Sequence, residues 1–303
     1  MRELSSVKRE YDLLLKALEN RPSAFRNDGY DVYFKESVFQ DEIVSKMSDE
    51  DKKSYDSGAG GELKEHDHEG KTVPPSMSSV ASSSRFCYLS LKDSDFTAFG
   101  IKNIKKNRVF EEHLPITRGT SPHMDCYLEC ENELCCFECK CHEQFDEHTI
   151  GLAVSYFKKD RIVLKIPEKF IIEKNKKVNK SIQHIISSKA FGINEKPMFD
   201  IKQLLTHIMG IQARQEKMRH SKEKRDIPAR LIYFYFIPDK VVNSNSDVND
   251  AINQLYKEIE TVFNCQIVKE NIKNITLELY VQFSDKVETA TKNNVRKITF
   301  NKQ

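Results

Sequence analysis

The stretch LECENELCCFECKCHE, residues 128–143, contains five of the eight cysteines of the chain. It joins two apolar runs, MDCYLEC at 124–130 and LCCFECKCH at 134–142, through a polar turn at 131–133. Two apolar runs separated by a short polar turn predict a β-hairpin. Both the fold and the candidate site are inferred outward from this hairpin.

Side chains of a strand point alternately to its two faces. Glu138 and Lys140 are therefore expected on one face of the second strand, and Cys139 and Cys141 on the other. Asp125 belongs to the first strand, and a short hairpin can bring its carboxylate near Glu138. The alternation thus predicts two carboxylates and one ammonium group on a single sheet face.

This combination suits metal-assisted hydrolysis of a phosphodiester. Asp125 and Glu138 can hold Mg²⁺, a hard cation that prefers oxygen ligands and keeps positions open for water and phosphate. Such a cation polarises phosphoryl oxygens and lowers the pKa of a bound water. Lys140 can orient the attacking water or stabilise charge that develops in the transition state.

Hydrophobic periodicity places the remaining elements. Residues 160–196 show no clear pattern. The order of helix, three strands, helix, strand, helix and strand is typical of an α/β sandwich around a mixed sheet. Helices are predicted at 1–20, near 37–48, at 86–93 after a capping serine run at 82–84, and at 147–158, 199–218 and 248–264; further strands are predicted at 107–114, 231–237 and 276–283.

Composition divides the chain into three parts. Residues 49–85 are rich in Gly, Ser, Asp and Pro, which predicts a long loop. Residues 1–48 are expected to form an N-terminal helical extension. The α/β domain is then expected over 86–303.

SPHMD, ending at Asp125, followed by Glu138-Cys139-Lys140, resembles the signature of the PD-(D/E)XK, or restriction-endonuclease-like, nuclease superfamily. His123-Met124 stands where the signature has its Pro, a position that varies in the superfamily. Other segments resemble bacterial restriction endonucleases of this superfamily: SGAGGEL at 57–63, PPSMSSVASSS at 74–84, FEEHLPI at 110–116 and KQLLTHIMGI at 202–211.

The resemblance implies an αβββαβ core, with a mixed central sheet flanked by helices, and an endonuclease that cuts DNA with Mg²⁺, or with Mn²⁺ as a substitute. RNA stays open as a substrate, and a homodimer is compatible with cutting two strands. Carried over residue by residue, the resemblance implies Asp125 and Glu138 as metal ligands, Lys140 as the catalytic lysine, Glu111 as a further acidic residue, and Glu143, Gln203 and His207 as supporting residues.

The charge balance is close to neutral, with 48 Lys and Arg against 46 Asp and Glu, so a uniformly basic nucleic-acid-binding surface is excluded. Three basic runs, at 102–108, 174–180 and 213–225, could still contact phosphates. A helical stripe of Gln203, His207, Gly210 and Arg214 either faces solvent or faces the catalytic strands. The residues predicted to bind nucleic acid are Lys105, Lys106, Arg108, Arg214, Lys217 and Arg219.

The cysteines allow another interpretation. Cys126-x₃-Cys130 and Cys136-x₂-Cys139 have spacings seen in zinc sites, and a zinc-stabilised module over 126–141 that binds nucleic acid or protein is the first alternative function. Strand alternation separates these thiols, and free cysteine is often a small buried apolar residue. Core packing is therefore favoured over Zn²⁺ or redox sensing. A nuclease fold that binds without cutting is the second alternative.

The N-terminus is charged and shows no secretory signal, and no apolar run reaches the roughly 18 residues of a membrane span. Six cysteines between residues 126 and 141 suit a reducing compartment. We therefore expect a cytoplasmic protein with no membrane partner.

Overall fold

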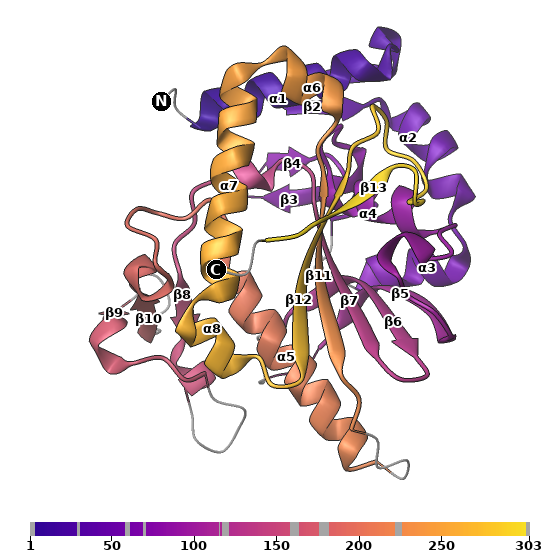
Figure 1. The fold of residues 1–303 in the computed structure, drawn as a ribbon. Helices are drawn as coiled ribbons and strands as arrows, with labels where there is room; N and C mark the ends of the chain where they lie inside the picture. Colours follow the sequence, from indigo (N-terminus) through magenta and orange to yellow (C-terminus); the bar gives the residue numbers. More distant parts are fainter. Residues whose placement is uncertain are drawn as a thin grey trace.

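The computed structural model describes residues 4–28, 31–57, 61–68, 71–114, 116, 121–157, 164–175, 182–221 and 226–300. Its centre is a six-stranded mixed sheet in the order β13-β12-β11-β7-β6-β5 (Figure 1). The strands of this sheet are β5 (Ile104–His113), β6 (His123–Cys130), β7 (Leu134–Lys140), β11 (Ala229–Phe236), β12 (Ile275–Gln282) and β13 (Val295–Ile298).

Helices flank the sheet on both sides (Figure 1). The helices are α1 (Leu4–Glu19), α2 (Glu36–Glu42), α3 (Asp49–Ser57), α4 (Ser83–Leu91), α5 (Ile201–Arg219), α6 (Asp239–Ser244), α7 (Ser246–Asn264) and α8 (Gln266–Asn271). Smaller sheets are formed by β1 (Phe25–Asp28) with β2 (Asp31–Phe34), by β3 (His66–His68) with β4 (Lys71–Val73), and by β8 (Gly151–Ala153), β9 (Ile171–Asn175) and β10 (Ile182–Ile186).

The central sheet combines two kinds of pairing. β5, β6 and β7 form an antiparallel meander, whereas β7, β11 and β12 run parallel. Parallel neighbours need a long crossover, usually through a helix. Here α5 lies between β7 and β11 in the chain, and α6 to α8 lie between β11 and β12. The predicted hairpin, the predicted strand at 107–114 and the mixed α/β architecture are confirmed.

Local capping fixes where the two helices next to the hairpin begin. The Ser82 hydroxyl accepts a hydrogen bond from the Arg85 backbone N–H at 3.1 Å, so α4 starts within the predicted serine run. The Asp200 carboxylate accepts one from the Gln203 backbone N–H at 2.9 Å and begins α5. Such caps satisfy helix N–H groups that have no partner within the helix.

The buried apolar side chains form one cluster that runs from Val7 in α1 to Val295 in β13. β11 is buried along nearly its whole length, as its continuous apolar sequence predicted. Tyr11 of α1 donates a hydrogen bond from its hydroxyl to the Phe236 carbonyl at 2.6 Å. The N-terminal helix therefore packs on the same core as the central sheet.

One predicted helix is wrong. The predicted helix at 147–158 is instead strand β8 followed by a single 3₁₀ turn, Val154–Phe157, with residue 158 outside the described part. β8 pairs with β10, and this non-local pairing overrides the local helical pattern. The unassigned stretch 160–196 contains β9 and β10.

The long loop predicted over 49–85 contains regular structure in its described residues. These include α3, the β3–β4 pair and the first turn of α4. α3 buries only Tyr55 among its side chains, so it lacks the apolar periodicity that reveals a helix. None of the helices in the described part of the chain combines the length and apolar composition that a membrane crossing requires.

Candidate active site

The sheet register brings the predicted acidic residues level with one another. Cys126 pairs with Phe137 across β6 and β7. Asp125 and Glu138 are the next residues on these strands in the direction away from the turn, so they lie directly opposite each other. Glu111 of β5 lies between the pairs Phe110–Cys126 and Glu112–Met124, again level with Asp125. Three carboxylates from three adjacent strands therefore form a row across the sheet.

We call the sheet face that carries Asp125, Tyr127, Glu138, Lys140 and Tyr233 the acidic face. α5 covers part of it, because the Arg214 guanidinium of α5 lies 5.2 Å from the centre of the Tyr127 ring. Tyr233 packs against Phe199, which precedes α5, and against Phe263 of α7. The strand alternation predicted from the sequence is thus observed.

A cavity of about 420 Å³ opens on the acidic face. All seven residues predicted as catalytic or supporting line it: Glu111, Asp125, Glu138, Lys140, Glu143, Gln203 and His207. The structure adds Glu62, Ser83, Ser84, Pro122, His123, Asp200, Lys202 and Thr206 to its walls.

Lys140 is a largely buried cation in the wall of this cavity. Its Nζ lies 2.6 Å from Glu138 Oε1 and donates a hydrogen bond to Gln203 Oε1 at 2.8 Å. Burial disfavours its charge, but the nearby carboxylates of Glu138, Glu143 and Asp125 outweigh burial and raise the pKa of Lys140. The lysine is therefore held as an ammonium ion.

Burial, together with the charges of neighbouring carboxylates, raises the pKa of each carboxyl in the row. Burial and the charges of Glu62 and Glu138 raise the pKa of Glu111 to about 8. Burial, Glu138 and Glu111 raise the pKa of Asp125 well above its usual range, although Asp125 Oδ2 accepts a 2.6 Å hydrogen bond from the Cys139 backbone N–H. Burial also raises the pKa of Glu138, despite its pairing with Lys140.

Glu143 behaves in the opposite way. Burial disfavours its ionisation, but Lys140, His142 and several hydrogen bonds outweigh that effect and lower the pKa of Glu143 to about 2. Its Oε2 accepts hydrogen bonds from the backbone N–H groups of Cys141 at 3.0 Å and His142 at 3.1 Å. Glu143 is therefore a fixed negative charge, whereas the three carboxyls in the row can share protons.

α5 supplies one wall through the stripe predicted from helical spacing. His207 is 1 % exposed, and its Nε2 lies 3.6 Å from Glu138 Oε2. Burial and Lys140 lower the pKa of His207 to about 3, so its imidazole is neutral. Gly210 lies against Leu114 and Pro122. The stripe faces the strands, and the solvated alternative is wrong.

Glu62 is the most informative residue that the site prediction lacked. Its side chain is half-buried, and its buried Oε2 atom has no hydrogen-bond partner in the described part of the chain. Burial raises its pKa, opposed by a hydrogen bond with Ser84. Its segment, SGAGGEL, carried part of the family resemblance, and that resemblance was the available signal; residues 58–60 of the segment lie outside the described residues.

The six basic residues predicted to bind nucleic acid lie away from the cavity walls. Lys105 and Lys106 are exposed near the start of β5, and Lys217 and Arg219 are exposed near the end of α5. Arg108 pairs with Asp51 at 3.3 Å, and Arg214 forms an ion pair with Glu112. Most of the basic run at 174–180 and residues 222–225 lie outside the described part.

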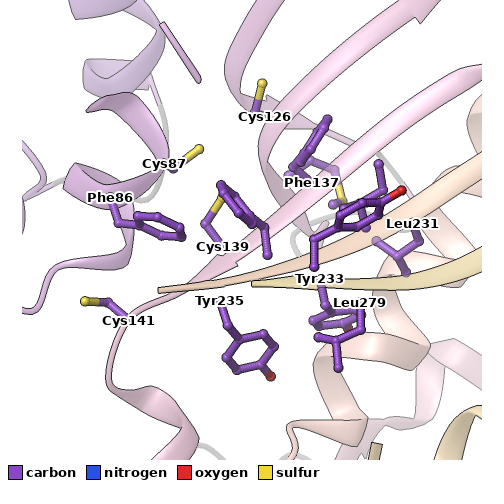
Figure 2. Close-up of a cluster of buried hydrophobic side chains, with 14 of the residues drawn as sticks. Phe86, Cys87, Cys126, Phe137, Cys139, Cys141, Leu231, Tyr233, Tyr235 and Leu279 are labelled. Atoms are coloured by element: carbon purple, nitrogen blue, oxygen red, sulfur yellow. The ribbon is translucent and has the colours of Figure 1, made fainter. Parts of the chain in front are cut away.

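We call the opposite side of the hairpin the sulfur face; it carries Cys126, Phe137 and Cys139. Cys87 of α4 lies beside Cys126 and Cys139 there (Figure 2). Burial raises the pKa of all three thiols, that of Cys139 to about 11. These thiols are neutral groups in an apolar core, as the packing interpretation expects.

The four cysteines whose spacing suggested a zinc site do not all lie on the same face of the sheet. Cys136 pairs with Tyr127, whereas Phe137 pairs with Cys126, so Cys136 lies on the acidic face and Cys126 on the sulfur face. Residues 126, 130, 136 and 139 therefore do not surround one point. A different group, Cys130, Glu133 and Cys135, does bring its ligand atoms together at the end of the hairpin.

The row of carboxylates has the donor set of a site for a hard divalent cation. Its donors are oxygens, as Mg²⁺ and Mn²⁺ prefer. Glu138 Oε2 is buried and has no hydrogen-bond partner within the described ranges. Burial, followed by repulsion from neighbouring carboxylates, raises the pKa values of Asp125 and Glu111, and a bound cation would relieve the repulsion. Asp125 and Glu138, which lie opposite each other on β6 and β7, could thus hold the metal, with Glu111 beside them. Among the described residues, only Cys130, Glu133 and Cys135 bring three ligand atoms within 4.8 Å of one another.

No family model matches the chain, and comparisons with curated proteins and with solved structures also give no match. The function therefore has to be inferred from the site itself.

Proposed function

We propose that the chain is a divalent-metal-dependent nuclease of the PD-(D/E)XK type, which hydrolyses phosphodiester bonds of DNA. The observation that carries the proposal is the meeting of Asp125, Glu138 and Lys140 in one cavity. These residues come from adjacent strands, and Lys140 Nζ lies 2.6 Å from Glu138 Oε1. Two carboxylates and an ammonium group beside a cavity provide a metal site and a charged donor in the same place.

The order of elements around the site supports the proposed family. α4, β5, β6, β7, α5 and β11 occur in this order along the chain, with the small β8–β10–β9 sheet inserted between β7 and α5. Apart from that insertion, the order is the αβββαβ order that the sequence resemblance implies. β7 and β11 are parallel, and the preceding strands form an antiparallel meander. Fold alone does not establish function, so the residues of the cavity remain the principal argument.

The cavity walls indicate why a cation would be needed before a phosphodiester binds. Lys140 and Lys202 are its two lysines, and the pKa of both His123 and His207 is lowered. The acidic residues are more numerous: Glu62, Glu111, Asp125, Glu138, Glu143 and Asp200. In their ionised forms these carboxyls would repel a polyanion. Mg²⁺ held by Asp125 and Glu138 would supply the missing positive charge and polarise the phosphoryl oxygens.

Lys140 is suited to donate hydrogen bonds rather than to remove a proton. Its raised pKa keeps the ammonium form, and Gln203 Oε1 holds one of its protons in place. A fixed ammonium group can orient a water molecule and stabilise negative charge that develops on phosphate oxygens. Gln203 is accordingly a positioning residue that acts through Lys140.

Cleavage assays with the purified chain test the proposal. Single-stranded DNA, duplex DNA and RNA are incubated with Mg²⁺, Mn²⁺ or EDTA at several salt concentrations. We expect DNA cleavage with Mg²⁺ or Mn²⁺ and none with EDTA. Asp125→Asn, Glu138→Gln and Lys140→Ala should each lower the rate by at least about 100-fold, the scale of losing a major electrostatic contribution to catalysis.

Glu50→Gln and Lys257→Ala are matched controls, because both side chains are exposed on helices outside the cavity. They should leave the rate within about twofold. Circular dichroism and thermal melting establish that each variant is folded. A folded chain that leaves all three substrates intact, or cleavage that persists in Asp125→Asn, would show that the proposal is wrong.

A further inference from the structure

A second group of potential metal ligands lies at the turn between β6 and β7. One side-chain ligand atom from each of Cys130, Glu133 and Cys135 lies within 4.8 Å of the other two. The turn is held closed by a hydrogen bond from the Cys130 backbone N–H to the Glu133 carbonyl at 2.9 Å. The three side chains are thus positioned by the hairpin itself.

The ligand types differ from those of the acidic cavity. Two sulfur atoms and one carboxylate oxygen favour a thiophilic ion such as Zn²⁺, whereas an all-oxygen set favours Mg²⁺. Cys130 and Cys135 are buried, while the Glu133 side chain is 28 % exposed. An ion could therefore enter from the Glu133 side.

Charge in the surroundings also suits a dithiolate site. Two thiolates, one carboxylate and Zn²⁺ would carry a net charge of about −1. Arg230 of β11 pairs with Cys135 in the sheet register, and its Nη1 lies 3.7 Å from Glu133 Oε1. The guanidinium would offset the remaining negative charge. It is held in place by Glu278, whose Oε2 accepts a 2.7 Å hydrogen bond from Arg230 Nε.

This group is separate from the proposed nuclease site. Cys135 and Lys140 are five residues apart on β7, or about 17 Å along an extended strand. Strand alternation places Cys135 on the sulfur face and Lys140 on the acidic face. The two sites can therefore be tested independently.

We propose that Cys130, Glu133 and Cys135 bind one Zn²⁺ ion, with solvent in the fourth position of a tetrahedral site. The ion would tie the end of β6 to the start of β7 and fix the turn between them. Metal binding adds to folding stability when the unfolded chain has no preformed site. Zinc is thus expected to stabilise the hairpin end without taking part in the proposed cleavage reaction.

Metal content and Co²⁺ spectroscopy test the proposal. The full chain is produced with zinc in the medium, kept under reductant and dialysed, and its zinc is measured by mass spectrometry. We expect one zinc per chain. Co²⁺ substitution should give a thiolate-to-metal charge-transfer band and strong visible bands typical of tetrahedral geometry. Cys130→Ser with Cys135→Ser should abolish both signals.

Glu133→Gln provides a variant that should fold normally, because this side chain is partly exposed. It should weaken zinc binding by at least about tenfold. Cys265→Ser is the matched control and should keep full zinc content. Absence of bound zinc from the wild-type chain, zinc retained by the double serine variant, or a Cys130–Cys135 disulfide in place of metal under reductant would each overturn the proposal.

Discussion

The acidic face and the sulfur face are the two sides of one hairpin, and neighbouring residues on the two faces can be almost equally buried. Glu138 is 2 % exposed and its neighbour Cys139 is 0 % exposed. On the sulfur face, burial keeps the thiols neutral and they pack like apolar groups. On the acidic face, burial crowds carboxyl groups whose ionised forms repel one another. The same environment therefore stabilises one face and strains the other.

This difference shows that burial alone does not identify a functional residue. A buried cysteine is common in ordinary cores, whereas a buried carboxylate is rarely found without a partner. The informative residues in the hairpin are those whose burial has a large free-energy cost. Substitutions on the two faces should therefore respond differently to pH and to divalent metal ions.

The largest stability effect is expected for Lys140→Met. This change removes the ammonium partner of Glu138 and leaves a buried carboxylate unpaired, at a cost of about 3–5 kcal/mol near pH 8. The cost should shrink near pH 5, where Glu138 can take up a proton. Urea unfolding at both pH values measures the difference. Gln203→Met should cost only about 1 kcal/mol, and an equal loss for Lys140→Met at both pH values would contradict the interpretation.

A smaller effect is expected from Glu111→Gln. The pKa of Glu111 rises from its ordinary value of 4.5 to about 8 in the fold, so the folded chain binds this proton more tightly than the unfolded chain. The contribution of this bound proton to the free energy of unfolding is fully present below pH 4.5 and is lost as pH rises through about 8. The difference in pKa corresponds to at most about 5 kcal/mol of unfolding free energy, and solvent screening at this half-buried carboxyl lowers the expected loss to about 2 kcal/mol. In EDTA, Glu111→Gln should remove this pH-dependent loss.

Urea titrations between pH 5 and 9 measure that change. Addition of Mg²⁺ at pH 8.5 should restore stability to the wild-type chain more than to Glu111→Gln, since a bound cation compensates the ionised carboxylate. An identical pH dependence for the two chains in EDTA would place Glu111 outside the repelling row.

Gly210→Ala tests how closely α5 must approach the acidic face. A Cβ atom at this position would lie 2.8 Å from Leu114 Cβ and 2.9 Å from Pro122 Cγ. In an open helix, alanine in place of glycine is favourable by about 1 kcal/mol, but overpacking here should make the change destabilising by about 1–2 kcal/mol. Thermal unfolding measures it, with Glu216→Ala on the exposed side of α5 as a near-neutral control. A stabilised Gly210→Ala chain would mean that the helix can move outward freely.

The smallest effect is expected on the sulfur face. Cys139→Ala removes one sulfur atom from a packed core and should cost about 1 kcal/mol. Because the pKa of the Cys139 thiol is raised to about 11, this cost should not change between pH 5 and pH 8. Urea unfolding at the same two pH values used for Lys140→Met gives the comparison. A strongly pH-dependent cost would show that the thiol ionises in the fold.

Much of the site could be predicted because strand alternation is a local property. The two-residue period separates Glu138 and Lys140 from Cys139 without any knowledge of the rest of the fold. The turn at 131–133 then determines that Asp125 stands level with Glu138. Glu111 and Glu143 came only from family resemblance, since their positions depend on pairing and turns that no local pattern reveals.

Other features could not be predicted because they depend on contacts between distant segments. Glu62 reaches the cavity from a glycine-rich segment with no periodicity. β8 takes its conformation from pairing with β10, and α3 has too few apolar residues to show a helical period. The distance between the basic residues and the cavity also depends on the tertiary fold. Lys105 and Lys217 have the positive charge that phosphate binding needs, but they lie near the start of β5 and the end of α5, by the β6–β7 turn and away from the cavity.

Glu111 adopts φ of +49° within β5, a left-handed conformation that costs a non-glycine residue about 1–2 kcal/mol. Asparagine or glycine would relieve this strain, and either would also remove a carboxylate from the repelling row. A library selected only for thermal resistance without metal should therefore replace Glu111 early and lose the proposed activity in doing so. Stability and the proposed catalysis would place opposite demands on this position, which makes it an expected point of trade-off in any redesign of the protein.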